Sequence, residues 1–391
     1  MDAATAVASA RKPPLRFGRN EWSGAFGDLG TDLPLLVGII LAARLDAASA
    51  LILFGLMQVL TGVLYRMPMP VQPLKAMAAL VIAQKLPGNL LLGGGLAIGS
   101  AMLVLSATGW IEWLARVVPK SVVRGIQLGL GLQLAGIALR EYMRADGPAG
   151  LILAAAGFAL TVALIGRRRV PAAVILIVIG AAYALTFKLG AGIFGQAFGF
   201  RLPVLHLPAL SDIWTGFLRL ALPQLPLSIA NSVLATRQLV EDFFPERALS
   251  ARRIGLTYSA MNLINPWFGG VPTCHGSGGL AGHYAFGGRT GGSVVIYGGL
   301  YLVLGLFFSR GFDRVIQVFP LPVLGVLLLF EGLTMAALVR DLGPDRPSFT
   351  IAVLVGLVSV YLPYGYVMGL LGGTALAALS RRGWIRLGVD A

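Results

Sequence analysis

Residues Gly269–Ser293 read "GGVPTCHGSGGLAGHYAFGGRTGGS" and decide the fold, because they interrupt a chain that is otherwise strongly apolar. The stretch contains ten glycines, two histidines and the only cysteine. Apolar sequence flanks it on both sides, "IGLTYSAMNLINPWF" before it and "VVIYGGLYLVLGLFF" after it. A loop in water would explain such a composition, but the rest of the sequence favours a broken helix inside a membrane.

The composition indicates a membrane protein. Of the 391 residues, 57% are hydrophobic and 12% are charged, which is about half the charged fraction of a soluble protein. Apolar runs near the roughly 20 residues that cross a bilayer recur along the chain. We therefore predict an all-α polytopic membrane protein. We expect no cleaved signal peptide, no intramolecular disulfide, no metal site and no cofactor, and no motif points to an enzyme.

Hydropathy predicts about 14 transmembrane segments in two halves of seven. The net charge of +14 is compatible with nucleic acid or a membrane surface, but most of the 31 Lys and Arg residues fall at segment ends on one side. This bias predicts both termini in the cytoplasm, a multi-pass plasma-membrane protein and no nucleic-acid partner. The predicted domains are a cytoplasmic segment 1–21, a first repeat 22–205, an inverted second repeat 206–381 and a cytoplasmic tail 382–391. The predicted segments are 22–43, 47–66, 73–86, 90–115, 120–140, 149–166, 170–188, 212–236, 251–268, 273–286, 292–309, 318–339, 348–363 and 365–381.

Two predicted segments, 73–86 and 273–286, are too short to cross a membrane. Pro70 and Pro73 stand before and at the start of the first, which has about a dozen residues of helix, roughly 20 Å against a hydrocarbon core of roughly 30 Å. Pro272 and its neighbouring glycines break the second. Interrupted segments at matching positions of two halves indicate a transporter site between inverted repeats. Two helix N-termini that meet inside the membrane would form a dry, positive pocket for an anion.

Four stretches of the sequence carry a family resemblance: "FGDLGTDLPL", "MPVQPLKAMAA", "PQLPLSIANSVLA" and "VPTCHGSGGLAGHYAFGGRTGGS". They resemble the signature segments of the molybdate transporter family, relatives of the sulfate permeases, over about residues 24–330. The resemblance implies the seven-plus-seven inverted-repeat fold with a core and a gate domain. It also implies molybdate, a tetrahedral oxyanion, as substrate at the junction of the third and tenth segments. The sequence departs from the family pattern at Asp32, where an uncharged aromatic residue is expected, and at His283, where an amide is expected.

The two short segments supply most of the candidate binding residues. An intramembrane lysine is functional by default, so Lys75 is read as binding or balancing charge, with snorkelling to an interface as the alternative. Gln72 offers donors without charge, or it caps a helix or bonds to another one. His275 stays open between ligand and satisfied structural residue, and Cys274 is expected to pack. These candidates are Gln72, Lys75, Thr273, Cys274, His275, Gly276 and Ser277.

The segment 212–236 carries a polar stripe. Gln224 and Asn231 are seven residues apart and therefore share one helix face, with Ser228 between them. We place Gln224, Asn231 and the adjacent Ser232 at the pocket, with hydrogen bonding between helices as the alternative.

Three intramembrane acids are candidates for coupling or gating. Asp28 and Asp32 lie four residues apart in the first segment, and Glu331 lies in the twelfth. Direct coordination of a dianion is not expected, because carboxylates repel it. A role as proton carrier is one interpretation, and a salt bridge from Asp28 to Lys75 or Arg289 is the other.

These observations predict a secondary active transporter, with the intramembrane acids suggesting protons as the coupling ion. The family resemblance implies import of molybdate, by movement of a core domain against a gate domain. The expected partners are molybdate, with tungstate or sulfate as further substrates, and membrane lipid, with homodimerisation left open. A sulfate transporter would use the same pocket. A nucleobase transporter of this fold should have acids on the eighth and tenth segments, where this sequence has Asn231 and a Gly/Ser run. A membrane-embedded enzyme would need a nucleophile or metal set that the sequence does not offer.

Overall fold

The structure is a computed structural model that describes residues 14–164, 172–188, 198–247, 249–385 and 387. Most of the predicted N-terminal segment 1–21, the junction of segments 149–166 and 170–188, and half of the predicted tail 382–391 lie outside the described residues.

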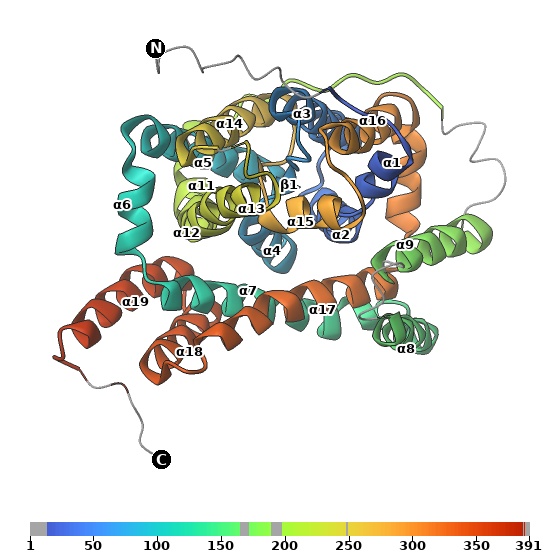
Figure 1. The fold of residues 1–391 in the computed structure, drawn as a ribbon. Coiled ribbons are helices and arrows are strands. Elements are labelled where there is room, and N and C mark those ends of the chain that lie inside the picture. The colour runs from blue at the N-terminus through green and yellow to red at the C-terminus, as the bar shows by residue number, and fades with distance from the viewer. Residues whose placement is uncertain (1–13, 165–171, 189–197, 248, 386, 388–391) are drawn as a thin grey trace, which may run out of the picture.

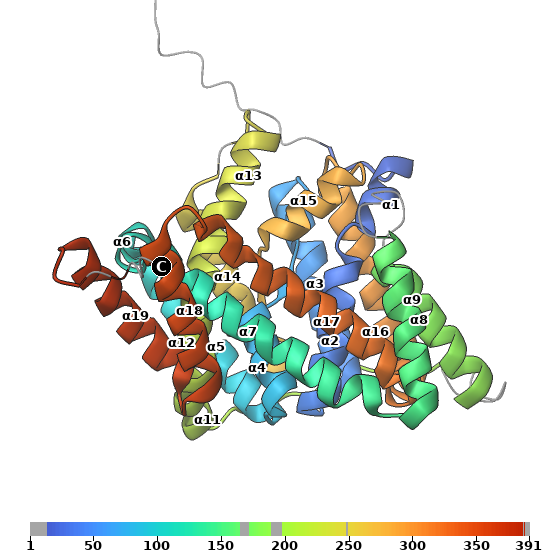
Figure 2. The ribbon, with the colours of Figure 1, turned by 90° about the horizontal axis from the view of Figure 1, so that it is seen from below.

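The described residues form two groups of helices that lie side by side (Figures 1 and 2). The strand group takes its name from two short strands and contains α1 (Arg19–Ala25), α2 (Leu29–Ala43), α3 (Ala47–Tyr65), β1 (Gln72–Pro73), α4 (Lys75–Gln84), α5 (Gly88–Thr108), α11 (Leu210–Gly216), α12 (Leu222–Leu227), α13 (Thr236–Phe243), α14 (Ala251–Ile264), β2 (Thr273–Cys274), α15 (Ser277–Ala285) and α16 (Gly292–Val318). The α7 group contains α7 (Lys120–Arg140), α8 (Gly147–Leu164), α9 (Ala172–Tyr183), α17 (Leu321–Ala337), α18 (Arg346–Tyr361) and α19 (Gly365–Arg381). The short helix α6 (Trp110–Val117) connects the two groups and packs on α5.

Short π and 3-10 segments extend several of these helices. The π segments are η2 (Ala184–Lys188), η3 (Phe217–Ala221) and η4 (Ser228–Ala235), and the 3-10 segments are η1 (Tyr142–Arg144), η5 (Asn265–Phe268) and η6 (Leu338–Leu342). By length and composition, 7 helices within the described ranges could span a membrane. They cover Ala47–Tyr65, Gly88–Thr108, Lys120–Arg144, Gly147–Leu164, Leu210–Phe243, Gly292–Val318 and Leu321–Leu342.

Close backbone approach holds each group together. Within the strand group, α3 packs along α16, and a Cβ added to Gly55 would lie 2.6 Å from the carbonyl oxygen of Gly298. In the α7 group, α7 packs on α17 and α18, and a Cβ added to Gly332 would lie 2.7 Å from the carbonyl oxygen of Gly131. Small residues at such contacts let helices approach closely in an environment where apolar burial drives association weakly.

The strands β1 and β2 pair antiparallel in the middle of the strand group, with Gln72 opposite Cys274. The side-chain amide of Gln58 donates to the Val71 carbonyl oxygen at 2.7 Å and accepts from the Val71 N–H at 3.0 Å. Asn262 holds Thr273 in the same way, at 2.6 and 2.9 Å. Each strand is therefore fixed by a bidentate amide from a neighbouring long helix, which satisfies backbone groups that the membrane interior would leave unpaired.

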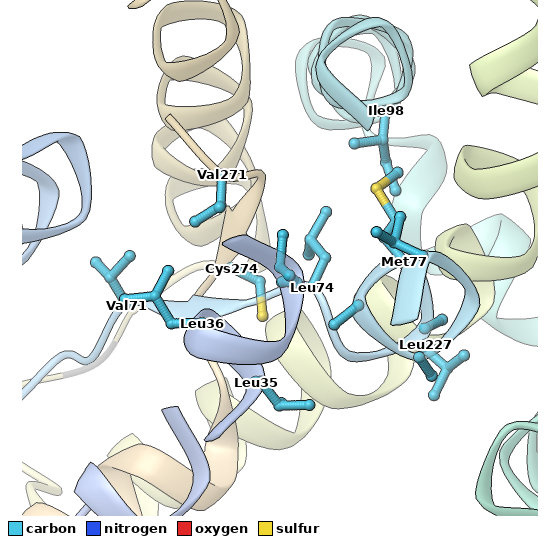
Figure 3. Close-up of a cluster of buried hydrophobic side chains, with 14 of the residues drawn as sticks. Leu35, Leu36, Val71, Leu74, Met77, Ile98, Leu227, Val271 and Cys274 are labelled. Atoms are coloured by element: carbon cyan, nitrogen blue, oxygen red, sulfur yellow. The ribbon is translucent and has the colours of Figure 1, made fainter. Parts of the chain in front are cut away.

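Apolar side chains from several helices close over the paired strands (Figure 3). Leu35 and Leu36 of α2, Ile98 of α5 and Leu227 of α12 all contribute to this cluster around Cys274, and all are nearly or fully buried. The paired strands are therefore buried in apolar packing.

Helices α4 and α15 begin directly after the two strands and contain 10 and 9 residues. At about 1.5 Å per residue each is roughly 15 Å long, half the hydrocarbon thickness. The prediction of two short helices is confirmed, but their predicted starts are wrong. Pro73, Thr273 and Cys274 lie in extended strands, because Pro73 and Pro272 flank or occupy the pairing positions and lack the N–H that a helix would use.

Several other predicted boundaries are wrong. The segment 22–43 is two helices that break at residues 26–28, where Gly27 packs against the backbone of Gly282. The segment 90–115 ends at Thr108, because Gly109 adopts a φ of +77°. The segment 212–236 runs from 210 to 243 with π turns beside Pro223 and Pro226, whose missing N–H groups displace the regular ladder. The segment 251–268 changes to a 3-10 turn at 265, and 292–309 continues to 318.

Candidate functional site

The N-terminus of α4 is capped by a side chain from α12. The side-chain oxygen of Gln224 accepts from the N–H groups of Ala76 at 2.9 Å and Met77 at 3.3 Å. The Gln224 amide nitrogen donates to Ser228 at 3.0 Å, and the Ser228 hydroxyl lies 2.7 Å from the Tyr258 hydroxyl. Gln224 thus takes the role of an N-cap supplied from another helix, which uses up N–H groups that the sequence analysis assigned to an anion.

The N-terminus of α15 has no such cap. Gly276 occupies the N-cap position and has no side chain to offer, and no described side chain caps the helix there. The first N–H groups of α15 and the positive end of its dipole are therefore available to a negatively charged group. The two short helices look equivalent in sequence but differ in this respect.

Gln72 and Asp28 meet over this uncapped N-terminus. The Gln72 side-chain amide donates to both carboxylate oxygens of Asp28, each at 2.7 Å. A Cβ on Gly276 would overlap the side-chain oxygen of Gln72, and a Cβ on Gly279 would overlap a carboxylate oxygen of Asp28. Both side chains therefore lie directly against the first turn of α15, in space that only glycines leave open. All of these groups are buried.

Asn231 reaches the same helix start from the other side. The Ser277 hydroxyl donates to the Asn231 side-chain oxygen at 2.8 Å. Asn231 also lines a cavity of about 280 Å³ between α7 and η4, large enough for a small oxyanion with several waters. The other lining residues include Lys120, Arg124 and Gln127 from α7 and Ile229 and Leu234 from η4.

Basic side chains line this cavity, which we call the α7 cavity. Arg124 makes a bidentate contact with Asp341 at 2.6–3.2 Å and donates to Gln127 at 2.8 Å. Lys120 pairs with the same carboxylate at 3.0 Å. Two cations against one carboxylate leave a positive balance at the cavity. Sequence reasoning had counted both basic residues only as charges at a segment end.

Lys75 connects the two helix groups. Its ammonium lies 3.0 Å from a carboxylate oxygen of Glu331 on α17, and the two side chains are 27% and 12% exposed. The predicted alternative, a salt bridge from Asp28 to Lys75 or Arg289, is wrong. Asp28 bonds to Gln72, and the Arg289 guanidinium donates to the Tyr284 carbonyl oxygen and stacks on the Tyr284 ring.

The two residues that depart from the family pattern share Tyr297 as a neighbour. The Tyr297 hydroxyl donates to one oxygen of Asp32 at 3.5 Å, and its ring centre lies 5.9 Å from that of His283. The second oxygen of Asp32 and both ring nitrogens of His283 are buried, with no hydrogen-bond partner among the described residues.

Four candidate ligands lie in packed positions. His275 is satisfied at both ring nitrogens, by Thr257 at 2.8 Å and the Pro70 carbonyl oxygen at 3.0 Å, so the structural interpretation of this histidine is favoured. Thr273 bonds to Asn262, Cys274 lies in the apolar cluster (Figure 3), and Ser232 is 2% exposed in η4. Of the predicted candidates, Gln72, Asn231, Gly276 and Ser277 are the ones brought together at the start of α15.

Sequence comparison identifies the family of this chain. Residues 20–134 and 216–335 match the family described as "Molybdate transporter of MFS superfamily", which is more than half of the chain. The chain belongs to this molybdate transporter family. Relatives include "Molybdate transporter 2" of Arabidopsis thaliana, 36% identical over 383 residues that cover 85% of this chain and 82% of the relative. "Molybdate transporter 1" of Chlamydomonas reinhardtii is 29% identical over 476 residues, covering 92% and 91%.

Solved structures define the fold of this member of the molybdate transporter family. The transmembrane domain of the cyanobacterium bicarbonate transporter BicA superposes with a TM-score of 0.66 at 17% identity, over 94% of this chain and 98% of that one. SLC26A9 superposes with a TM-score of 0.67 at 15% identity, over 94% and 66%. The predicted relation to the sulfate permease fold is confirmed, and the protein is a multi-pass membrane transporter, not an enzyme.

Proposed function

We propose that this protein is a secondary active transporter that imports molybdate across the plasma membrane, with both termini in the cytoplasm and with protons as the coupling ion. The observation that carries the proposal is the uncapped N-terminus of α15, which Gln72, Asn231 and Ser277 surround in a chain of the molybdate transporter family. Backbone N–H groups, two amides and a hydroxyl are the donors that a tetrahedral oxyanion needs.

The proposed architecture is a repeat of seven segments followed by an inverted repeat of seven. Reciprocal helix contacts support it. The second segment (α3) packs on the eleventh (α16), and the ninth (α14) packs on the fourth (α5). Similarly, the fifth (α7) packs on the thirteenth (α18), and the twelfth (α17) packs on the sixth (α8). A pseudo-two-fold axis in the membrane plane would generate such exchanged pairs.

Transport would proceed by movement of the strand group, as core, against the α7 group, as gate. The α7 cavity supports this proposal, because it lies between the two groups and has Asn231 on one wall and Arg124 on the other. We propose it as the route between the site and one side of the membrane. Its basic balance would raise the local concentration of an oxyanion.

Removal of the Asn231 side chain should weaken molybdate binding. We expect Asn231→Ala to lose about 1–3 kcal/mol, the cost of an unmet buried partner, which corresponds to roughly 5- to 150-fold in Kd. Calorimetric titration of the purified variant measures this change. Asn89→Ala is the matched control, because Asn89 bonds to Asp212 at an exposed position at the start of α5. Equal affinities in both variants would assign Asn231 to structural bonding.

The substrate itself is tested by uptake into proteoliposomes that contain the purified protein. We expect saturable molybdate uptake, competition by tungstate and weaker competition by sulfate, and none by uracil. A nucleobase substrate is disfavoured because Asn231 and Ser277 stand where that class would need acids. If sulfate competes more strongly than molybdate itself, the protein is a sulfate transporter of the same fold. Uptake of uracil would contradict the proposed oxyanion site.

A further inference from the structure

The side chain of Asp28 is an anion that already occupies the proposed oxyanion site. Both of its carboxylate oxygens accept from the Gln72 amide at 2.7 Å, and one of them occupies the space that a Cβ on Gly279, in the first turn of α15, would take. A bound oxyanion would use the same two features, a side-chain amide and a helix N-terminus. Asp28 is 3% exposed, so water does not replace these partners.

The break between α1 and α2 places Asp28 there. Gly24 and Gly27 pack against the backbone of α15 so closely that a Cβ on Gly27 would lie 2.8 Å from the backbone nitrogen of His283. This contact with the second half of α15 fixes the start of α2 against that helix, and Asp28 then lies next to Gly279 in its first turn. Asp28 is the N-cap residue of α2 but makes no capping bond with its side chain. Its carboxylate is directed at Gln72 instead of at its own helix.

Charge balance makes a second anion costly while Asp28 is ionised. The titratable groups that face Asp28 are Asp32 on its own helix, Lys75 on α4, Glu331 on α17, Cys274 on β2, and Tyr297 and Tyr301 on α16. Lys75 is the only cation among them and is already neutralised by Glu331 at 3.0 Å. A dianion added to this set would bring further negative charge into a buried region without a free counter-charge.

We infer that Asp28 is an internal stand-in for the substrate, which must take up a proton and release the Gln72 amide before an oxyanion can bind at α15. The inference rests on the proposed function and gives its proton coupling a physical route. Protonation removes the repulsion and converts Asp28 into a weaker acceptor, so that the Gln72 N–H groups turn to the oxyanion. One proton then enters the site with each dianion and returns to solution when the dianion leaves.

The direction of the pH dependence follows from this competition. Binding needs the neutral form of Asp28, so affinity is highest at low pH and falls as pH rises, by up to about tenfold per pH unit. Asp28→Asn keeps an acceptor for the Gln72 amide but cannot ionise. We expect this variant to bind molybdate with an affinity that is independent of pH and exceeds that of the unmodified protein at alkaline pH.

The test is equilibrium binding of molybdate to the purified full-length protein across about pH 6 to 8.5, with Asp32→Asn as the matched variant. Asp32 is the neighbouring buried acid and does not bond to Gln72, so Asp32→Asn should retain the fall in affinity. Asp28→Asn with an unchanged pH profile, or with no binding at any pH while it remains monodisperse, would overturn the inference.

A second measurement needs no variant. Titration of the unmodified protein at alkaline pH, in buffers of different ionisation enthalpy, reports the protons taken up with each molybdate bound. We expect close to one proton, and zero would overturn the inference. Molybdate binding that is strong but independent of pH would refute the role of Asp28 and leave the proposed function intact. Absence of molybdate binding at every pH would instead refute the proposed function.

Discussion

Gly276→Ala is expected to reduce molybdate uptake by about 100-fold or more. A methyl group at this position would overlap the side-chain oxygen of Gln72 and push that side chain away from the start of α15. The displaced amide would no longer be placed to donate to the oxyanion and would block the N–H groups of the helix. Each donor that the bound oxyanion loses costs about 1–3 kcal/mol, and about 1.4 kcal/mol is a factor of ten.

The expected loss is one of function more than of folding. Gly276 has a φ of −82° and a ψ of 130°, which any L-residue adopts, so alanine introduces no backbone strain. The obstructing atom is the end of a flexible side chain, which can move. Thermal unfolding should therefore change little, while uptake at equal protein per vesicle should be lost.

Gly278→Ala is the control for this variant. It adds the same methyl group to the same helical turn, but no atom lies within 4 Å of the new Cβ. We expect normal uptake and a slight gain in stability, because alanine favours a helix over glycine by about 1 kcal/mol. Near-normal transport by Gly276→Ala, or equal losses in both variants, would contradict the assignment of the site to the start of α15.

The breaks that shorten two of the predicted helices depend on residues close together in the sequence, so they were predictable from it. Pro272 and the glycines that follow it exclude a continuous spanning helix whatever surrounds them, and Pro70 and Pro73 do the same in the first half. The short helices α4 and α15 therefore followed from composition and spacing. The strands did not, because Gln72 and Cys274 pair across two hundred residues and each strand is too short to show a period of two.

The candidate site was predictable only as a list of residue types. Gln224 and Asn231 share a face of one segment, as the spacing indicated, yet Gln224 caps α4 and Asn231 lines the α7 cavity. Which of them faces open space depends on where two other helices begin, and no local pattern encodes that. The bidentate amides of Gln58 and Asn262 were missed, although a lone amide in an apolar helix was a usable signal.

The second large effect is expected from loss of the ion pair between Lys75 and Glu331, which links the two helix groups. The residues are 256 positions apart in the sequence and come from α4 and α17, so their 3.0 Å ion pair joins the proposed core to the proposed gate. Lys75→Met would leave Glu331, whose side chain is 12% exposed, without a partner at this interface. Loss of one member of a mostly buried pair costs up to about 3–5 kcal/mol. We expect a large fall in uptake, about tenfold or more, and a lower thermal unfolding temperature.

The double variant Lys75→Met/Glu331→Leu separates a structural role of this pair from direct binding of the substrate. It removes both charges, and well-packed apolar residues often replace a buried ion pair without loss of stability. Unfolding temperature should therefore recover in the double variant. The preference for molybdate over sulfate should stay the same in both variants if, as we propose, donors at α15 set that preference, since Lys75 bonds to Glu331. Competition uptake measures this preference. If Lys75→Met loses the discrimination between the two oxyanions while Glu331→Leu alone retains it, the lysine contacts the substrate directly, and the site extends from α15 to the start of α4.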